Sequence, residues 1–134
     1  MPRVNYCHVT IECSGCPVKT LNSSRDILNV LRSAACSCHL NIIKEDLHRF
    51  APQGITAYVL LSESHISIHT WPEHRFAIVD VLSCSSFDVD ALVGCLRKAL
   101  RPSSTSVSCH THRTGRRTKV SDETVMLSKN WTGD

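Results

Sequence analysis

Hydrophobic and polar residues alternate along residues 6–13 of the chain. Cys7, Val9 and Ile11 fall on one side of this stretch, and polar residues fall on the other. Because successive side chains of a strand point to opposite faces, the pattern predicts a half-buried strand. Further aliphatic or alternating segments predict the remaining strands, at residues 39–50, 55–61, 65–71, 76–84 and 106–112.

Two other segments carry hydrophobic residues at the spacing of a helix. The first follows polar capping residues at 22–24, and its apolar stripe runs from Ile27 to Ala35. The second follows Asp88, a good capping residue, and Pro102 stops it after Leu100. Residues 51–54, Ala-Pro-Gln-Gly, predict a turn between two strands.

The predicted order of elements is therefore β-α-β-β-β-β-α-β. Two amphipathic helices beside a mostly antiparallel sheet predict an α+β fold, a two-layer α/β sandwich with both helices on one face. The 134 residues are enough for one domain with a single core. We expect this domain to span residues 1–112 and the basic, polar residues 113–134 to form a poorly ordered tail.

Composition narrows the class of protein. Hydrophobic residues make up 42% and charged residues 20%, which is typical of a globular protein. No apolar run approaches the about 20 residues of a membrane span, and the first residues lack a signal-peptide core. We therefore expect a cytoplasmic protein with no membrane partner. The net charge is +3, and no aromatic residue lies among the cations of residues 112–119, so we do not expect nucleic-acid binding.

Eight cysteines are many for a chain of this length. Cys13 and Cys16 form a CxxC, and Cys36 and Cys38 follow the first predicted helix, so four thiolates could hold zinc. The single-residue spacing of the second pair is unusual for a zinc site, and free buried thiols behave as small hydrophobic groups. We therefore expect no metal.

The predicted hairpin of residues 65–84 carries the most unusual chemistry. If Trp71 pairs with Phe76, then His69 lies opposite Ile78 and His65 lies opposite Leu82. One face then carries acid–base groups and a thiol, from His65, Ser67, His69, Asp80 and Cys84. A solvated sheet face would look the same, so the pattern alone leaves that interpretation and a reactive site equally open.

Residues 61–73, LSESHISIHTWPE, resemble the self-processing segment of the prokaryotic S-adenosylmethionine decarboxylases, small pyruvoyl-dependent enzymes of polyamine synthesis. The resemblance continues upstream through residues 48–54 and downstream through residues 77–80 to Cys84. It covers about residues 5–112 and implies a two-layer α+β sandwich, in agreement with the pattern of elements.

The resemblance implies that the chain is a self-cleaving zymogen. The Ser64 hydroxyl would attack the carbonyl carbon of Glu63, and β-elimination of the resulting ester would break the chain. The dehydroalanine left at position 64 would hydrolyse to a pyruvoyl group with loss of ammonia. Residues 1–63 would become a β chain, and residues 64–134 an α chain that begins with this group. This group would form a Schiff base with S-adenosylmethionine and accept the electrons released with carbon dioxide, which serves spermidine synthesis.

The resemblance also assigns roles to individual side chains. His69 would move protons during processing, and Cys84 would return a proton to the decarboxylated substrate. Thr56 stands where the family usually has a serine that assists processing. The implied substrate-binding residues are Phe50, Trp71 and Glu73; for the two aromatic residues, core packing is an equally good interpretation.

Several features leave alternatives open. Residues 82–85, Leu-Ser-Cys-Ser, stand where the family has Phe-Thr-Cys-Gly, and losing that glycine could shift the backbone that aims Cys84. A pyruvoyl-dependent arginine or ornithine decarboxylase of the same fold is one alternative. An uncleaved binding or regulatory relative is another. Small members of the family work as dimers, so we expect a homodimer of processed αβ protomers.

Overall fold

A seven-stranded antiparallel sheet forms one layer of the molecule, with the strand order β2-β3-β4-β5-β1-β6-β7. The computed structural model describes residues 5–113 and 129–132. The strands are β1 Asn5–Ser14, β2 Ile42–Arg49, β3 Ile55–Leu61, β4 Ser64–Trp71, β5 Phe76–Ser83, β6 Ser104–Arg113 and β7 Lys129–Thr132. The helices are α1 Val18–Leu21, α2 Ser24–Ser37 and α3 Val89–Leu100, with a 3₁₀ turn, η1, at Pro72–His74.

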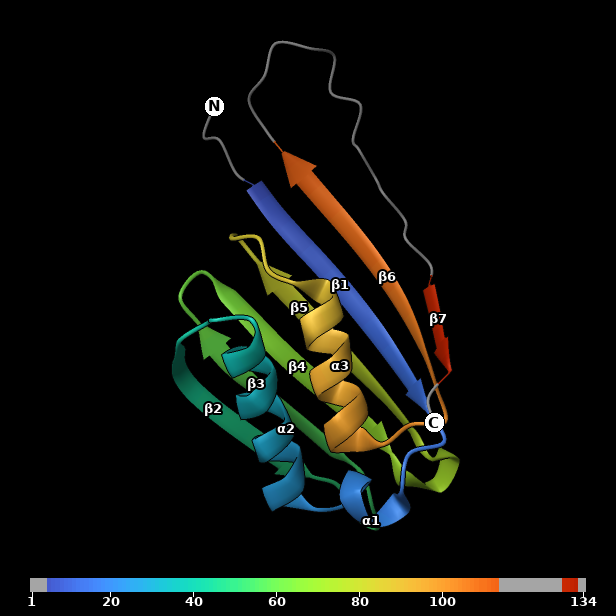
Figure 1. Cartoon of the computed structure of the whole chain (residues 1–134). Coiled ribbons are helices and arrows are strands. Elements are labelled where there is room, and N and C mark those ends of the chain that lie inside the picture. The colour runs from blue at the N-terminus through green and yellow to red at the C-terminus, as the bar shows by residue number, and fades with distance from the viewer. Residues whose placement is uncertain (1–4, 114–128, 133–134) are drawn as a thin grey trace.

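Helices α2 and α3 lie side by side against one face of the sheet (Figure 1), which confirms the predicted two-layer α+β sandwich. Both begin at the predicted caps. The Ser23 hydroxyl accepts a hydrogen bond from the Asp26 amide at 3.2 Å, and the Asp88 carboxylate accepts one from the Ala91 amide at 3.1 Å. Each cap satisfies a backbone donor that the first helical turn would leave unpaired.

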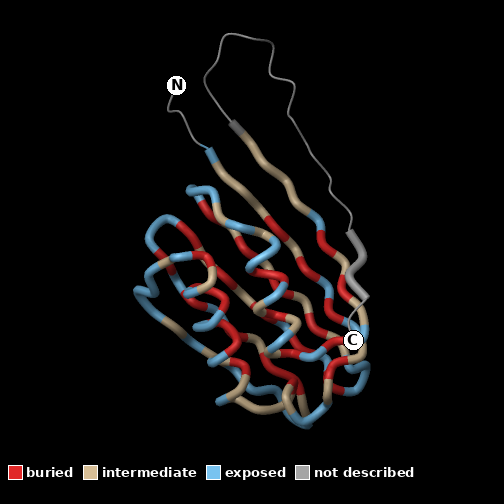
Figure 2. Tube along the Cα trace, viewed as in Figure 1, coloured by how far each residue is buried: buried red, intermediate tan, exposed pale blue. Residues whose placement is uncertain are grey.

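The hydrophobic core fills the space between the sheet and the two helices. Along β4 and β5 every second residue is buried, and Figure 2 shows this alternation along the strands. The fully buried side chains include Ile66, Ile68, Val79 and Val81 from the sheet and Ile27, Leu31, Leu92 and Leu96 from the helices. Each large aliphatic side chain buried in this way contributes about 1.5–3 kcal/mol.

The hairpin register is the predicted one. Trp71 pairs with Phe76, His69 with Ile78 and His65 with Leu82. The side chains opposite the core on these strands therefore point to the face of the sheet that carries no helix in the described part of the chain. We call it the open face.

Two predicted segments need correction. The strand expected at residues 39–50 spans only Ile42–Arg49, because residue 39 adopts a left-handed conformation (φ 56°) directly after α2. Part of the expected tail belongs to the sheet: β6 extends to Arg113, and β7 pairs with it through residues 129–132. Residues 114–128 of the expected tail, and 133–134, lie outside the described residues.

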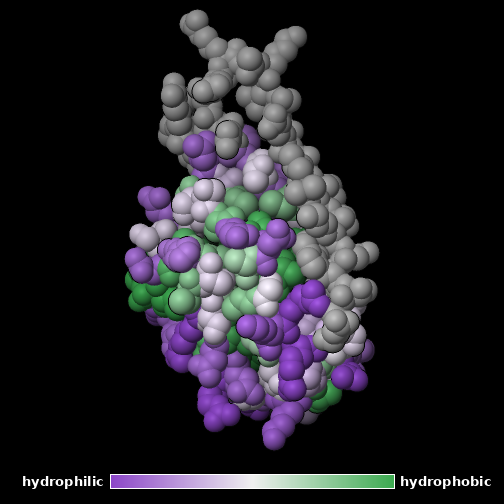
Figure 3. Space-filling model, in the orientation of Figure 1, coloured by the Kyte–Doolittle hydropathy of each residue, from purple (hydrophilic) through white to green (hydrophobic). Residues whose placement is uncertain are grey.

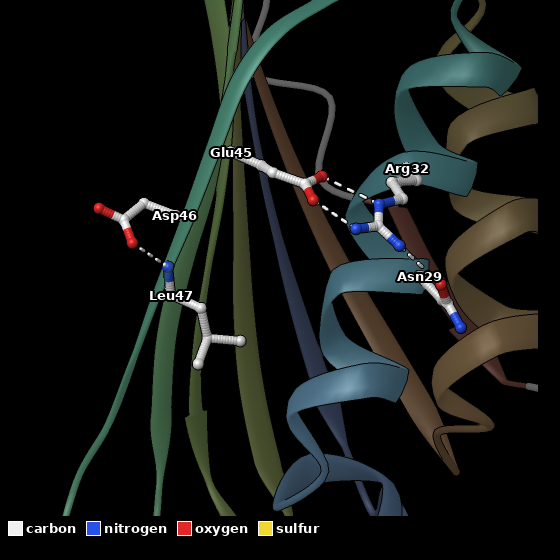
Figure 4. A network of polar contacts seen from close by, with 5 residues as sticks. All are labelled: Asn29, Arg32, Glu45, Asp46 and Leu47. Atoms are coloured by element: carbon white, nitrogen blue, oxygen red, sulfur yellow. Dashed lines mark hydrogen bonds and ion pairs between the residues drawn. The ribbon is translucent and has the colours of Figure 1, made fainter.

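Edge strand β2 is tied to α2 by a polar contact (Figure 4). The Arg32 guanidinium binds both carboxylate oxygens of Glu45, with 2.9 Å between Nε and Oε2, and also reaches Asn29 on its own helix. On the helix-bearing face, hydrophilic and hydrophobic residues are interspersed (Figure 3). Of the helices in the described ranges, none has the length and hydrophobicity needed to cross a membrane.

All eight cysteines are free thiols. Burial raises the pKa of Cys13 to about 12 and that of Cys16 to about 11, so both remain protonated. The Cys16 amide bonds to the Arg75 carbonyl oxygen. Cys38 interacts electrostatically with Cys95 and with Cys7. Within the described ranges, no group of three or more histidine, cysteine or acidic side chains is placed to hold a metal ion.

Candidate active site

The turn between β3 and β4 holds the peptide bond that joins Glu63 to Ser64. Leu61 pairs with Ser64, so only Ser62 and Glu63 form the loop. Glu63 adopts a left-handed backbone conformation with φ 61°. For a residue with a Cβ atom this conformation costs about 1–2 kcal/mol, and tight hairpin turns normally place glycine or asparagine there. The backbone directly before Ser64 is therefore strained.

Ser83, the last residue of β5, and Cys84, the residue after it, reach the two sides of this peptide bond. The Cys84 thiol donates a hydrogen bond to the Glu63 carbonyl oxygen at 3.1 Å. The Ser64 hydroxyl donates to the Ser83 hydroxyl at 3.4 Å. Neighbouring strand residues point to opposite faces, so Ser83 contacts the nucleophile from the core side and Cys84 contacts the carbonyl from the other side.

A cavity of about 400 Å³ opens beside Cys84. Its walls come from the start of β1, the segment after β5 and the end of β6, with Asn5, Tyr6, Cys7, Ser85, Ser86, Thr111 and His112 around Cys84. The Tyr6 ring stacks on the His112 ring at 5.3 Å between centroids. A cavity of this size fits a small organic molecule, and its position puts that molecule next to the Cys84 thiol.

The other predicted side chains gather at the opposite end of β4. The Nδ1 atom of His69 lies 3.0 Å from the Thr56 hydroxyl, on paired positions of β3 and β4. Trp71 packs beside His69, with 6.3 Å between ring centroids. Phe50 and Glu73 are exposed near this end, and the Phe50 and His48 rings pack edge to face.

Within one chain, these two groups do not meet. His69 lies five positions after Ser64 along β4, which is about 16 Å at the usual rise of a strand. The Ser64 side chain is buried on the core side, whereas His69 is exposed on the open face. The structure therefore brings Glu63, Ser64 and Cys84 together and places His69 and Thr56 elsewhere.

On the open face, His8 joins His65 and Asp80, which the sequence already placed on one face, in a polar cluster. The Asp80 carboxylate bonds to the Nε2 atoms of both His8 and His65, at 3.0 Å for His65. Partial burial opposes ionisation of Asp80, but the hydrogen bonds from the two histidines outweigh it and lower the pKa of Asp80. His8 comes from β1, and the pairing of β1 with β5 had no signal in the local pattern.

The replacement of glycine by Ser85 causes no backbone strain. The described non-glycine residues with positive φ are His39, Glu63, Arg75 and Arg101, and Ser85 is not among them. The Ser85 amide instead donates to the Ser83 hydroxyl at 3.2 Å. The hydrogen bond between Ser85 and Ser83 therefore fixes the backbone next to Cys84, although serine replaces the family's glycine at position 85.

Comparison with known proteins gives a consistent result. A family model described as S-adenosylmethionine decarboxylase matches residues 7–113. An S-adenosylmethionine decarboxylase proenzyme of Methanococcus maripaludis strain C5 is 44% identical over 77 residues, which are 58% of this chain and 63% of that relative. The match thus spans less than two thirds of that relative's length. The proenzyme of the same species' strain S2 is 38% identical over 101 residues, covering 75% of this chain and 83% of the relative.

Among solved structures, the adenosylmethionine decarboxylase of Aquifex aeolicus superposes with a TM-score of 0.75 at 28% identity. The superposition covers 89% of this chain and 99% of that one. The described sandwich is therefore the fold of that protein over nearly its whole length.

Proposed function

The chain belongs to the S-adenosylmethionine decarboxylase family, and we propose that it is a proenzyme that cuts itself between Glu63 and Ser64 and then decarboxylates S-adenosylmethionine. One observation carries the proposal. Glu63 has a strained backbone, its carbonyl oxygen accepts a hydrogen bond from the Cys84 thiol at 3.1 Å, and the Ser64 hydroxyl lies on the adjacent residue. A solvated, purely structural hairpin would have no need of this arrangement.

The first step of self-cleavage, which forms the ester, follows from these atoms, and β-elimination of that ester then breaks the chain. Attack by the Ser64 oxygen on the Glu63 carbonyl carbon forms a C–O bond and breaks the C–N bond, and the hydroxyl proton ends on the released nitrogen. The thiol of Cys84 bonds to the oxygen on which negative charge develops. Breaking the C–N bond also releases Glu63 from its left-handed conformation, so the strain favours the reaction.

The residues around position 64 fit the pyruvoyl group that would form there. This group supplies an electron sink for the loss of carbon dioxide. Cys84 lies beside residue 64 and in the wall of the 400 Å³ cavity, where its thiol can return a proton to the substrate's α-carbon.

We further propose that two copies pair through their open faces. His69 lies about 16 Å from Ser64 along β4, and Thr56 is its paired neighbour on β3, so neither can serve the cleavage site of its own chain. A two-fold axis across the open face would lay the His69 end of one copy over the Ser64 end of the other. The same face exposes the large hydrophobic side chains Tyr58, Leu60 and Trp71, which pairing would cover.

Complementation tests this arrangement. Ser64→Ala and His69→Ala chains, carrying different tags, are each expected to remain uncut when expressed alone. When they are expressed together, the His69→Ala chain should be cut, because the Ser64→Ala copy supplies His69. A control that pairs His69→Ala with a second His69→Ala chain should stay uncut. Failure of the mixed pair to cut would disprove the shared site.

The activity itself is tested by two measurements on the purified protein. Intact-mass spectrometry should show chains of residues 1–63 and 64–134, the larger with a blocked N-terminus. Carbon dioxide release should be found with labelled S-adenosylmethionine and not with arginine or ornithine. A single uncut chain after prolonged incubation would indicate a non-catalytic relative. Carbon dioxide release from arginine or ornithine would show that the protein is a decarboxylase of that amino acid instead.

A further inference from the structure

We propose that Ser83 is a positioning residue for the self-cleavage, because it fixes the direction of the Ser64 hydroxyl. The inference rests on the proposed function but concerns a residue to which the family resemblance gave no role. Ser83 is the last residue of β5, it is 0% exposed, and its hydroxyl is the hydrogen-bond partner of the Ser64 hydroxyl.

The hydrogen bonds of Ser83 determine which atom is the donor. A hydroxyl has one proton to donate and two lone pairs that accept. The Ser83 proton goes to the Ser85 carbonyl oxygen at 2.9 Å, and one lone pair accepts from the Ser85 amide at 3.2 Å. The remaining lone pair faces Ser64 at 3.4 Å, so Ser64 must be the donor.

This polarity is the one that the attack requires. With its proton directed at Ser83, the Ser64 oxygen keeps its own lone pairs free for the adjacent Glu63 carbonyl carbon. Ser64 is only 8% exposed, so water has little access to orient its hydroxyl instead. Cys84 meanwhile holds the carbonyl oxygen. Two adjacent residues thus orient the nucleophile and the electrophile separately.

The size of the effect follows from the length of the bond. At 3.4 Å it is longer than the usual 2.7–2.8 Å between two hydroxyl oxygens, so it orients Ser64 without holding it tightly. Losing one neutral hydrogen bond of this kind is expected to slow cleavage by about threefold to tenfold. The step is redox-neutral and needs no other reactant, since the proton of Ser64 ends on the nitrogen of the same residue.

Ser85 offers a matched control on the same hydrogen-bond network. Its own hydroxyl lies 3.2 Å from that of Ser83 and competes for the lone pair that faces Ser64. Ser85→Ala removes this competitor and leaves the backbone amide and carbonyl that hold Ser83. We therefore expect Ser85→Ala to cut at least as fast as the wild type, and Ser83→Thr, which keeps the hydroxyl, to cut within about twofold of it.

The experiment follows precursor made by cell-free translation and measures the first-order rate of chain cleavage on gels. A pulse of hydroxylamine at early times cuts any ester between Ser64 and Glu63. Ser83→Ala should lower both the cleavage rate and the hydroxylamine-sensitive fraction, because the ester forms more slowly. A purely structural role would lower the melting temperature without this loss.

Two results would overturn the inference: cleavage of Ser83→Ala at the wild-type rate, or slow cleavage with an unchanged hydroxylamine-sensitive fraction. If Ser83→Ala does not fold, Ser83→Cys is measured by the same criteria, since it fills the same space with a poor acceptor. An uncut wild-type chain would instead refute the proposed function, so the two failures are distinguishable.

Discussion

Replacing Glu63 by glycine tests whether backbone strain drives the self-cleavage. Glu63 holds φ 61° in a two-residue turn, directly before the bond that we propose is cut. Glycine adopts this conformation without penalty, because it has no Cβ atom. The substitution should therefore stabilise the uncut chain and slow its cleavage at the same time.

The magnitudes follow from the conformation. The left-handed strain is about 1–2 kcal/mol, and glycine's extra freedom in the unfolded chain costs about 0.5–1 kcal/mol. The uncut fold should thus gain about 0.5–1 kcal/mol. The cleavage rate compares the folded precursor with its transition state, so the unfolded-chain cost does not enter. Release of half of the strain in the transition state predicts cleavage about twofold to fivefold slower.

Glu63→Ala is the matched control, since it removes the exposed carboxylate but keeps the Cβ atom and hence the strain. Stability is measured by urea unfolding with each substitution placed in the uncleavable Ser64→Ala chain. Cleavage is measured as a time course of translated precursor, with Ser64 intact. The quantity of interest is the ratio of the glycine rate to the alanine rate. A ratio of one or more, together with a stabilised glycine fold, would refute a role for strain.

Three further predictions concern other side chains of the site. Cys84→Ser keeps a donor for the Glu63 carbonyl, so the chain should still be cut, but decarboxylation should fall by about a hundredfold or more, because a hydroxyl is a poor acid. Cys84→Ala removes both the donor and the acid, so decarboxylation should fall as far and cleavage should also slow severalfold. Thr56→Val removes the 3.0 Å contact to His69 and should slow cleavage about threefold to tenfold, whereas Thr56→Ser keeps the hydroxyl and should not. Equal cleavage rates for the two variants would show that the Thr56 hydroxyl has no role in processing. The lowered pKa of Asp80 means that its ionised form stabilises the fold above about pH 4 and that this stability is lost as the pH falls through the lower folded value. In the Ser64→Ala background, the free energy of unfolding measured in urea between about pH 5 and pH 2 should therefore depend less on pH for Asp80→Asn. An unchanged slope would show that Asp80 is not stabilised by its two histidine partners.

Local patterns predicted the hairpins well and the long-range pairing not at all. The register of the β4–β5 hairpin, in which Trp71 pairs with Phe76, followed from the short loop and from the alternation of hydrophobic and polar residues. Both are properties of residues close together in the chain. The position of β1 between β5 and β6 depends on contacts between segments far apart in the chain. The sequence therefore predicted neither the contact between His8 and Asp80 nor the pairing of residues 129–132 with β6.

The left-handed Glu63 had no distinctive sign in the sequence either. Hairpin turns that need positive φ usually show glycine or asparagine, and this turn shows Ser62 and Glu63. The absence of the favoured residue is itself informative once the turn is known. In a hairpin selected only for stability, glycine at this position would raise the stability. The strain at Glu63 therefore fits a segment that is cleaved.

The separation of Ser64 from His69, in contrast, could have been derived from numbering alone. The two positions differ by five, an odd number, so a regular strand must turn their side chains to opposite faces. Ser83 and Cys84 differ by one and approach the Glu63–Ser64 peptide from opposite sides, Cys84 from the side of the open face. His69 lies on that same open face. A histidine delivered by a second copy would therefore arrive next to the carbonyl that Cys84 holds, and the buried Ser64 hydroxyl would still depend on Ser83 of its own chain.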